Sequence, residues 1–419
     1  MSDPRAVGAA DRATHRAIEA VARQSYGRLV AYLSVRTRDV AAAEDALGDA
    51  LVSALLTWPR DGLPKSPDAW LLTSARNRLV DLARHRRVQW AHAEAFAQLA
   101  DAWADALPED DLPDERLRLL FVCAHPALDA SMHTPLMLQT VLGLDAAAIA
   151  RAFVVAPATM GQRLVRAKAK IRDAGIAFEI PDASQLPARL DAVLRAIYAA
   201  YGSGWEDATG TDARSGGLVD ESLWLARVLA QCMPDAAEVR GLLALMLHCE
   251  ARRPARRSSD GAFVPLSEQD PRHWIGALID EAERELAAAA ALHRPGRFQL
   301  EAAIQSAHAD RRNGRRTDWA AIALLYEGLV RLSPTLGARV GRAAAVAEAN
   351  GAVAGLELLD AIDAAAASSY QPYWAVRAHL SAATGRGAAA RAAFDRAIAR
   401  SDDPAIRAFL ASRRGARDV

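Results

Sequence analysis

Lysine is nearly missing from this chain of 419 residues: it occurs only at Lys65, Lys168 and Lys170, and every other cation is arginine. This usage indicates a GC-rich genome. The presence of an arginine is therefore not by itself evidence of a phosphate contact. A net charge is also missing, because 51 Lys and Arg balance 51 Asp and Glu. The overall charge therefore does not indicate what kind of partner the protein binds. Any evidence for a partner must come from how the charges are distributed along the chain.

Cysteine is scarce as well. Cys123, Cys232 and Cys249 lie far apart and form no CxxC pair, which argues against a structural zinc site and for a reducing compartment. No run is long and apolar enough to span a bilayer, and the N-terminus has no apolar signal segment. We therefore expect a cytoplasmic protein with no membrane partner.

The residue patterns of common enzyme sites are missing too. The sequence has no phosphate-binding glycine loop. His248, Cys249 and Glu250 are consecutive, so they do not share a helix face, and the other histidines show no ligand spacing. We predict that the protein is not an enzyme and that it holds no metal or cofactor.

What the sequence does contain is alanine, with few β-branched runs, and this composition favours helices. The predicted fold class is all-α, with two small helical domains, the second a helix-turn-helix, followed by a large helical C-terminal domain. We place these domains at residues 1–92, 116–180 and 181–419. The linker at 93–115 carries seven acids and no cation from Asp101 onward. It is either a solvated spacer or a mimic of nucleic acid in a basic channel.

The stretch from Leu144 to Arg172 predicts two short helices joined by a tight corner, with Asp145 as a cap and Pro157 at the start of the second helix. In that second helix, residues 158–172, one narrow stripe is apolar: Met160, Leu164, Ala167 and Ile171. The rest of its surface is polar and cationic, which suits the major groove of DNA. The alternative is an amphipathic helix with a solvated basic face. The candidate DNA-binding residues are Thr159, Gln162, Arg163, Arg166, Lys168 and Lys170.

Two further helices are predicted upstream. In residues 39–58 one face is apolar, with Leu47, Leu51, Ala54 and Trp58, and the opposite face mixes acids with apolar residues, which indicates either a sandwiched core helix or a partner surface. A proline-rich loop at 59–67 leads into a basic helix at 68–87, whose buried row is Leu72, Ala75, Leu79 and Leu82. A basic helix beside an aromatic residue and a stiff loop is typical of proteins that hold single-stranded nucleic acid, although Trp70 also suits the core.

The C-terminal part reads as an array of helices with a degenerate repeat. Val340 and Trp374 are 34 residues apart, and Ala378, Ala390, Phe394 and Ala397 follow in the order of the tetratricopeptide pattern. Such repeats build a concave binding surface and not a catalytic pocket.

The order of these segments resembles a known family, the bacterial sigma factors of the extracytoplasmic-function type, and in particular the subgroup with a tetratricopeptide-like C-terminal extension. The resemblance covers roughly the first 180 residues. It rests on AAEDALGDAL at 42–51, on WPRDGLPKSPDAWLLTSARNRLVDLARHRR at 58–87, on RLRLLFVCAHPAL at 116–128 and on LDAAAIARAFVVAPATMGQRLVRAKAKIRDAGIAF at 144–178.

The resemblance implies that the first domain binds RNA polymerase core enzyme, through Asp45, Asp49, Val52 and Leu56. It also implies that this domain holds the single-stranded −10 promoter element, and that the helix-turn-helix binds the duplex −35 element through the candidate residues given above. The residues implied for the −10 element are Trp70, Arg76, Asn77, Arg84, Arg86 and Arg87. A regulatory role is expected for the C-terminal domain, with a protein or small molecule as its ligand.

Two departures from the family pattern stand out. Gly48 occupies a position where the family usually has glutamine, and the polar residues that often cap the helix-turn-helix are replaced by Ala148 and Ala156. Two alternatives compete with a sigma factor. One is a one-component repressor with a ligand-binding helical domain, and the other is a tetratricopeptide scaffold whose N-terminal part is only a partner-binding bundle.

Overall fold

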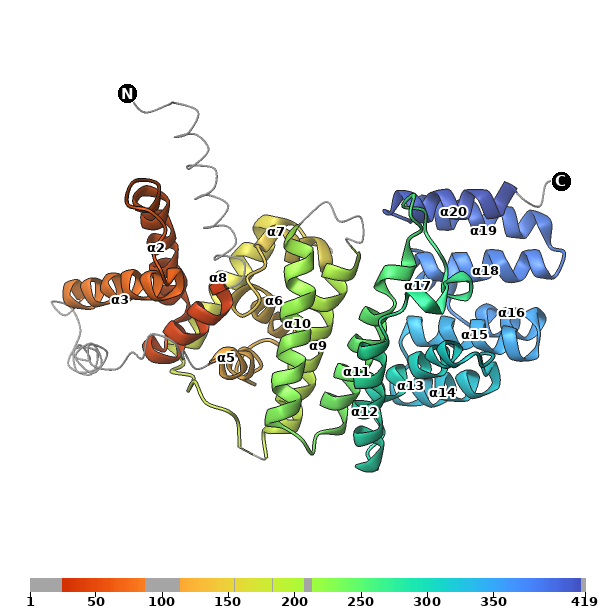
Figure 1. Ribbon diagram of the computed structural model, residues 1–419, viewed down its shortest axis with the longest axis horizontal. Helices are drawn as coiled ribbons and strands as arrows, with labels where there is room; N and C mark the ends of the chain where they lie inside the picture. The colour runs from red at the N-terminus through yellow and green to blue at the C-terminus, as the bar shows by residue number, and fades with distance from the viewer. Residues whose placement is uncertain (1–24, 87–113, 154, 183, 207–212, 416–419) are drawn as a thin grey trace, which may run out of the picture. The chain divides into compact units, whose positions relative to one another are not determined.

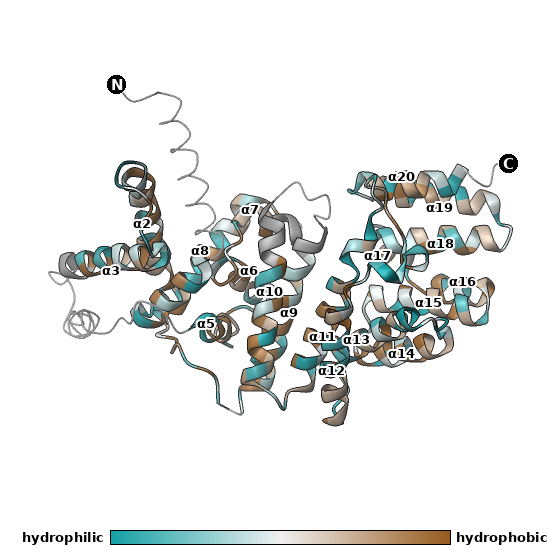
Figure 2. Ribbon diagram, in the orientation of Figure 1, coloured by the Kyte–Doolittle hydropathy of each residue, from teal (hydrophilic) through white to brown (hydrophobic). Residues whose placement is uncertain are grey.

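The computed structural model describes residues 25–86, 114–153, 155–182, 184–206 and 213–415. The described part is built from helices and contains no strand, which confirms the all-α prediction (Figure 1). The chain divides into two compact units, residues 1–225 and 226–419. Most helices carry both polar and apolar residues along their length, as Figure 2 shows, so each unit is formed by amphipathic helices that bury one side.

The first described element of the first unit is a helix at residues 25–37. The elements that follow it are α2 (Val40–Asp61), α3 (Pro67–Arg86), α5 (Arg116–Cys123), α6 (Ala130–Thr140), α7 (Ala146–Ala152), α8 (Pro157–Asp173), α9 (Leu186–Glu206) and the start of α10 (Ala213–Cys232).

Helix α2 packs against α3 through its predicted apolar face. Asp39 caps α2 by accepting a hydrogen bond from the Ala42 amide, at 3.1 Å. Leu47, Ala54 and Trp58 are buried as expected, whereas Leu51 of the same predicted face is only partly buried. In α3 the first three residues of the predicted row are buried, but Leu82 in the last turns is 41% exposed. Periodicity marks the face of a helix and does not show where the neighbouring helix stops covering it.

The proline-rich connection is shorter than predicted. Helix α2 continues through Pro59 to Asp61, and Gly62, whose φ is +86°, ends it by donating its amide hydrogen to the Trp58 carbonyl at 3.0 Å. A proline in the last turn removes only one intrahelical donor, and the burial of Trp58 just before it holds that turn in place. The loop before α3 is therefore limited to residues 62–66.

Helices α7 and α8 form the predicted pair. Asp145 accepts a hydrogen bond from the Ala148 amide at 2.7 Å, and Pro157 begins α8. All four residues of the predicted stripe, Met160, Leu164, Ala167 and Ile171, are buried. Ala156 gives no side-chain cap, as its lack of a polar group requires.

Helix α9 contacts α5 and α6, so it belongs to the first unit. The structural division after Leu225 therefore falls later than the domain border we placed at 180/181. Most of the predicted linker at 93–115 lies outside the described residues. Its last two residues are not a solvated spacer, because Glu115 is buried and Asp114 is bound to Arg116.

The second unit continues α10 and stacks its helices mostly in chain order, each contacting the next or the next but one. Its helices are α11 (Ala237–Ala251), α12 (Gly276–Ala291), α13 (Arg297–Ala309), α14 (Trp319–Leu332), α15 (Leu336–Asn350), α16 (Ala352–Asp360), α17 (Ala364–Ala367), α18 (Gln371–Ala383), α19 (Gly387–Ala399) and α20 (Pro404–Gly415). Short 3-10 turns lie at Arg253–Arg256, Leu266–Glu268, Pro271–His273 and Asp310–Asn313.

Small residues mark close approaches between these helices. Ala378 and Ala397 are fully buried in the same cluster as Trp374 and Phe394. At Gly341 a Cβ atom would lie 2.4 Å from the Tyr326 ring, so α14 and α15 can pack this closely only because position 341 is glycine. Close packing of this kind is required where helix pairs stack. The tetratricopeptide assignment itself stays a prediction.

A buried histidine gives the second unit a predicted pH dependence. His308 lies edge-on to Trp319, with ring centroids 5.3 Å apart, and burial, with Arg252 and Arg311 nearby, lowers its pKa to about 4. In the unfolded chain a histidine pKa is about 6.5. Between these values the unfolded state binds a proton that the folded state does not, so the free energy of unfolding falls as the pH is lowered, by up to about 1.4 kcal/mol per pH unit.

We therefore expect the His308→Gln variant to lose less stability than the unaltered chain between pH 7.5 and pH 5. Urea unfolding followed by circular dichroism at the two pH values measures this difference. The exposed His379 supplies the control, because His379→Gln leaves the burial around position 308 intact. The same pH dependence in the His308→Gln variant and in the unaltered chain would contradict the assignment.

Two classes of feature are absent from the described ranges. None of their helices combines the length and the hydrophobicity that a membrane span requires. Nor do these ranges contain a group of three or more His, Cys, Asp or Glu side chains placed to hold a metal ion.

Candidate nucleic-acid and partner interfaces

The outer face of α2 is acidic and apolar at once. Val52 is 57% and Leu56 62% exposed, and Asp45 is also exposed. Asp49 lies on the same face. Its carboxylate is 3.2 Å from Nε of Arg78 in α3, and its side chain is half exposed. Large apolar side chains that stay exposed in one group mark a surface for a partner. All four residues predicted for partner binding thus lie on one surface of α2.

Sequence reasoning did not single out two further exposed apolar residues near this face. Leu55 is 39% exposed beside Leu56, and Leu63, in the loop after α2, is 51% exposed. The helical periodicity of α2 assigned Leu55 to neither face, and loop residues have no periodicity at all. These two residues add exposed apolar side chains to α2 and to the loop that follows it.

The residues predicted to hold single-stranded DNA differ in how far they are exposed. Trp70 is half-buried and meets the buried Trp58 edge-on, with centroids 5.4 Å apart and an angle of 73° between the rings. Asn77 is exposed, and Arg76 is half-buried with contacts of its own. The side chains of Arg84 and Arg86, and all of Arg87, lie outside the described residues.

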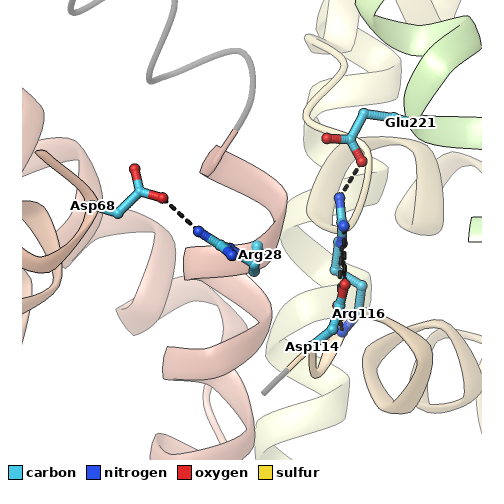
Figure 3. A network of polar contacts seen from close by, with 5 residues as sticks. All are labelled: Arg28, Asp68, Asp114, Arg116 and Glu221. Atoms are coloured by element: carbon cyan, nitrogen blue, oxygen red, sulfur yellow. Dashed lines mark hydrogen bonds and ion pairs between the residues drawn. The ribbon is translucent and has the colours of Figure 1, made fainter. Parts of the chain in front are cut away.

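An anchor at its first turn fixes the start of α3. Asp68 accepts a hydrogen bond from the Ser25 hydroxyl at 2.8 Å. It also pairs with Arg28, as Figure 3 shows. Both partners lie in the helix at 25–37, so α3 is tied to that helix as well as to α2. Trp70 and Asn77 therefore lie on a helix that is held by both α2 and the helix at 25–37.

The exposed surface of α8 matches the DNA-binding prediction in composition. Five of the six candidate residues lie at least partly exposed on it: Thr159, Gln162, Arg163, Arg166 and Lys170. Val165, which sequence reasoning left out, is 63% exposed on the same side as Gln162. The surface therefore combines cations with an amide, a hydroxyl and one apolar side chain, all groups that contact phosphates or base edges.

Lys168, the sixth candidate, does not lie on this surface. Its ammonium group forms an ion pair with Glu44 of α2, and the two side chains are only 11% and 12% exposed. Burial raises the pKa of the Glu44 carboxyl, and Lys168 opposes that rise. In this structure Lys168 therefore joins two helices and is not available to DNA.

A second buried cation, Arg116, was not singled out from the sequence. Its guanidinium binds Asp114, with an Nη2–Oδ2 distance of 2.9 Å, and also Glu221 of α10 (Figure 3). It lies over the Trp224 ring, 4.0 Å from the centroid. Because Glu221 is 105 positions away, no local pattern could have predicted this contact. Arg116 links the middle of α10 to α5.

Comparisons with known proteins agree with this geometry. The sigma-70 region 2 model matches residues 21–89, which contain α2 and α3, and a family of unknown function, DUF6596, matches residues 189–290. An uncharacterized protein of Rhizobium meliloti (strain 1021) is 38% identical over 392 residues, 92% of each chain, so the two proteins belong to one family. No solved structure matches. The chain therefore contains a sigma-70 region 2 domain, and this domain supports a sigma-70 family RNA polymerase sigma factor.

Proposed function

We propose that this sigma factor is of the extracytoplasmic-function type and directs core polymerase to promoters with −10 and −35 elements. The observation that carries the proposal is the outer face of α2. Its exposed Val52 and Leu56, beside Asp45 and Asp49, suit a partner surface that is apolar in the centre and basic at the rim. Since core polymerase is the partner, the proposed location is the cytoplasm.

The DNA contacts in this proposal are divided between two helices. Helix α3 offers Trp70, Arg76 and Asn77 to the melted −10 strand, where an aromatic ring stacks on bases and cations follow the backbone. Helix α8 acts as the recognition helix of a helix-turn-helix and offers Gln162, Arg163 and Arg166 to the −35 duplex. Run-off transcription with core polymerase on genomic fragments tests the proposal, and it fails if the chain directs no start site.

A third part of the proposal is regulation by the second unit, which takes the place of a separate inhibitor. The helix contacts show where the chain should be truncated to test this. A cut at residue 186 would remove α9 and uncover α5 and α6, whereas a cut after Cys232 keeps α9, α10 and the Arg116–Glu221 contact. The fragment 1–232 is therefore the appropriate test.

We expect the fragment 1–232 to give several-fold more run-off transcript than the full chain at equal concentration, because its inhibitory part is gone. Circular dichroism and core-polymerase binding of both proteins are the controls for folding and for assembly. Equal transcription by the two proteins, with equal core binding, would contradict regulation by the second unit.

A further inference from the structure

One arginine of the second unit is half-buried and has no carboxylate partner among the described residues. Arg252 directly follows α11. Its guanidinium donates hydrogen bonds to the side-chain oxygen of Gln305, in α13, and to the His248 carbonyl oxygen of α11, the latter at 3.4 Å. Both acceptors are uncharged. The end of α11 contributes only about half of a negative charge, so the positive charge of Arg252 is largely uncompensated.

The groups around Arg252 do not neutralise it. Arg252 lies within electrostatic range of His308 and Tyr326, and both side chains are uncharged at pH 7, because burial lowers the pKa of His308 to about 4 and raises that of Tyr326 to about 12. The Glu301 carboxylate, which is also near Tyr326, already binds the Arg297 Nε at 2.7 Å. A half-buried cation in neutral surroundings is costly, and an anion bound beside it reduces that cost.

Two tyrosine hydroxyls lie against one face of α15. That face has no side chains at Gly337 and Gly341, which are one helical turn apart. A Cβ atom at these glycines would lie 3.2 Å from the Tyr370 hydroxyl and 2.8 Å from the Tyr326 hydroxyl, respectively. Neither hydroxyl forms a hydrogen bond within the described ranges. Tyr370, which caps the start of α18, lies within electrostatic range of Tyr326, so both hydroxyls are available to one ligand.

We propose that Arg252, Gln305, Tyr326 and Tyr370 form a binding site for a small organic anion, a carboxylate or a phosphate. Nη1 of Arg252 donates to no group in the described part of the chain, and it binds the anion in a charge-assisted hydrogen bond. The two tyrosine hydroxyls donate to further oxygens of the ligand. A role for this ligand as the regulatory signal rests on the proposed function, whereas its binding does not.

Variants that remove one group at a time test the site in the full-length chain. Arg252→Gln removes the charge and keeps a polar side chain, and Tyr326→Phe and Tyr370→Phe each remove one hydroxyl. Arg339→Gln is the matched control, because Arg339 is exposed on the opposite side of α15 and its loss changes the net charge equally. Circular dichroism shows whether each variant is folded.

The probes are inorganic phosphate and citrate, at millimolar concentrations, and isothermal titration calorimetry measures their binding. We expect the unaltered chain to bind at least one probe. Arg252→Gln should bind it roughly 10- to 150-fold more weakly, since a hydrogen bond to a charged group is lost. Each tyrosine variant should bind roughly 2- to 10-fold more weakly, because the lost hydrogen bond involves a neutral donor. Arg339→Gln should bind as the unaltered chain does.

The site is overturned if neither probe binds, or if Arg252→Gln binds as well as the unaltered chain. An equal loss in Arg339→Gln also overturns it, since the effect would then be one of net charge. If Arg252→Gln does not fold, unchanged binding by both tyrosine variants overturns the site.

Calorimetry uses neither polymerase nor DNA, so its result is separate from that of run-off transcription. Normal transcription without probe binding counts against the site alone. Probe binding without any transcript counts against the proposed function alone.

Discussion

Core polymerase is expected to bind the Leu56→Asp variant roughly 30-fold more weakly than the unaltered chain, because a central apolar anchor of an interface contributes about 2 kcal/mol or more. The same change at Val52 should act similarly, since both side chains are more than half exposed on the outer face of α2. A carboxylate there would be buried against the partner without a counter-charge. Equilibrium binding of a fluorescently labelled chain to purified core enzyme measures the loss.

The control for this prediction is Leu324→Asp. Leu324 is 71% exposed on α14 of the second unit, so this change also adds an acid in place of an exposed leucine. It should leave core binding unaltered. Thermal unfolding of the three variants should match the unaltered chain, because none of these side chains is buried in the free protein. Weak binding by Leu324→Asp, or full binding by Leu56→Asp, would remove α2 as the partner surface.

The second large effect is expected on α8. Arg163→Ala and Arg166→Ala should each weaken binding of the holoenzyme to the −35 duplex by about 1–3 kcal/mol, which is roughly 5- to 150-fold. Both side chains are exposed, so the loss reflects missing DNA contacts and not unfolding. If an arginine contacts phosphate, its removal should also reduce the slope of log affinity against log salt by about 1. Fluorescence anisotropy with a labelled promoter fragment at several salt concentrations gives both quantities.

Arg172 provides the matched control on the same helix. It is exposed near the C-terminal end of α8, and its Nε pairs with Asp173 at 2.9 Å. On a helical projection it falls on the side opposite Arg163. Arg172→Ala should therefore change the affinity and the salt slope little. Equal losses for Arg172→Ala and Arg163→Ala would indicate a general charge effect in place of a recognition helix.

Local patterns were sufficient for several features of the fold. The buried stripe of α8 and the Asp145 cap were predicted correctly, because both depend on residues within a few positions of each other. The prediction of a loop from residue 59 was wrong because a propensity rule for proline ignored the packing of Trp58 beside it. Helix type and helix face are local properties, whereas the end of a helix depends on its neighbours.

Contacts between distant segments could not be predicted. Lys168 had the composition of a DNA-binding residue, yet it pairs with Glu44, which lies 124 positions away. Arg116 gave no signal at all, since its partner Glu221 lies far along the chain, beyond α6, α7, α8 and α9. Gly27 is one glycine among 25, and only the Val141 carbonyl oxygen, 2.0 Å from where a Cβ atom would lie, shows why it is needed. The exposed candidate surfaces of α2 and α8 were therefore predictable as compositions, and the contacts between distant helices were not.

The packing of α9 against α5 and α6 has a consequence for how the protein is made. A nascent chain that has reached residue 180 already contains α2 through α8, but the side of α6 that α9 covers is still open to water. That apolar surface is buried only after α9 has left the ribosome, and Arg116 finds Glu221 later still. Until then the partly synthesised chain exposes apolar surface that the finished protein buries, and such surface promotes aggregation during synthesis.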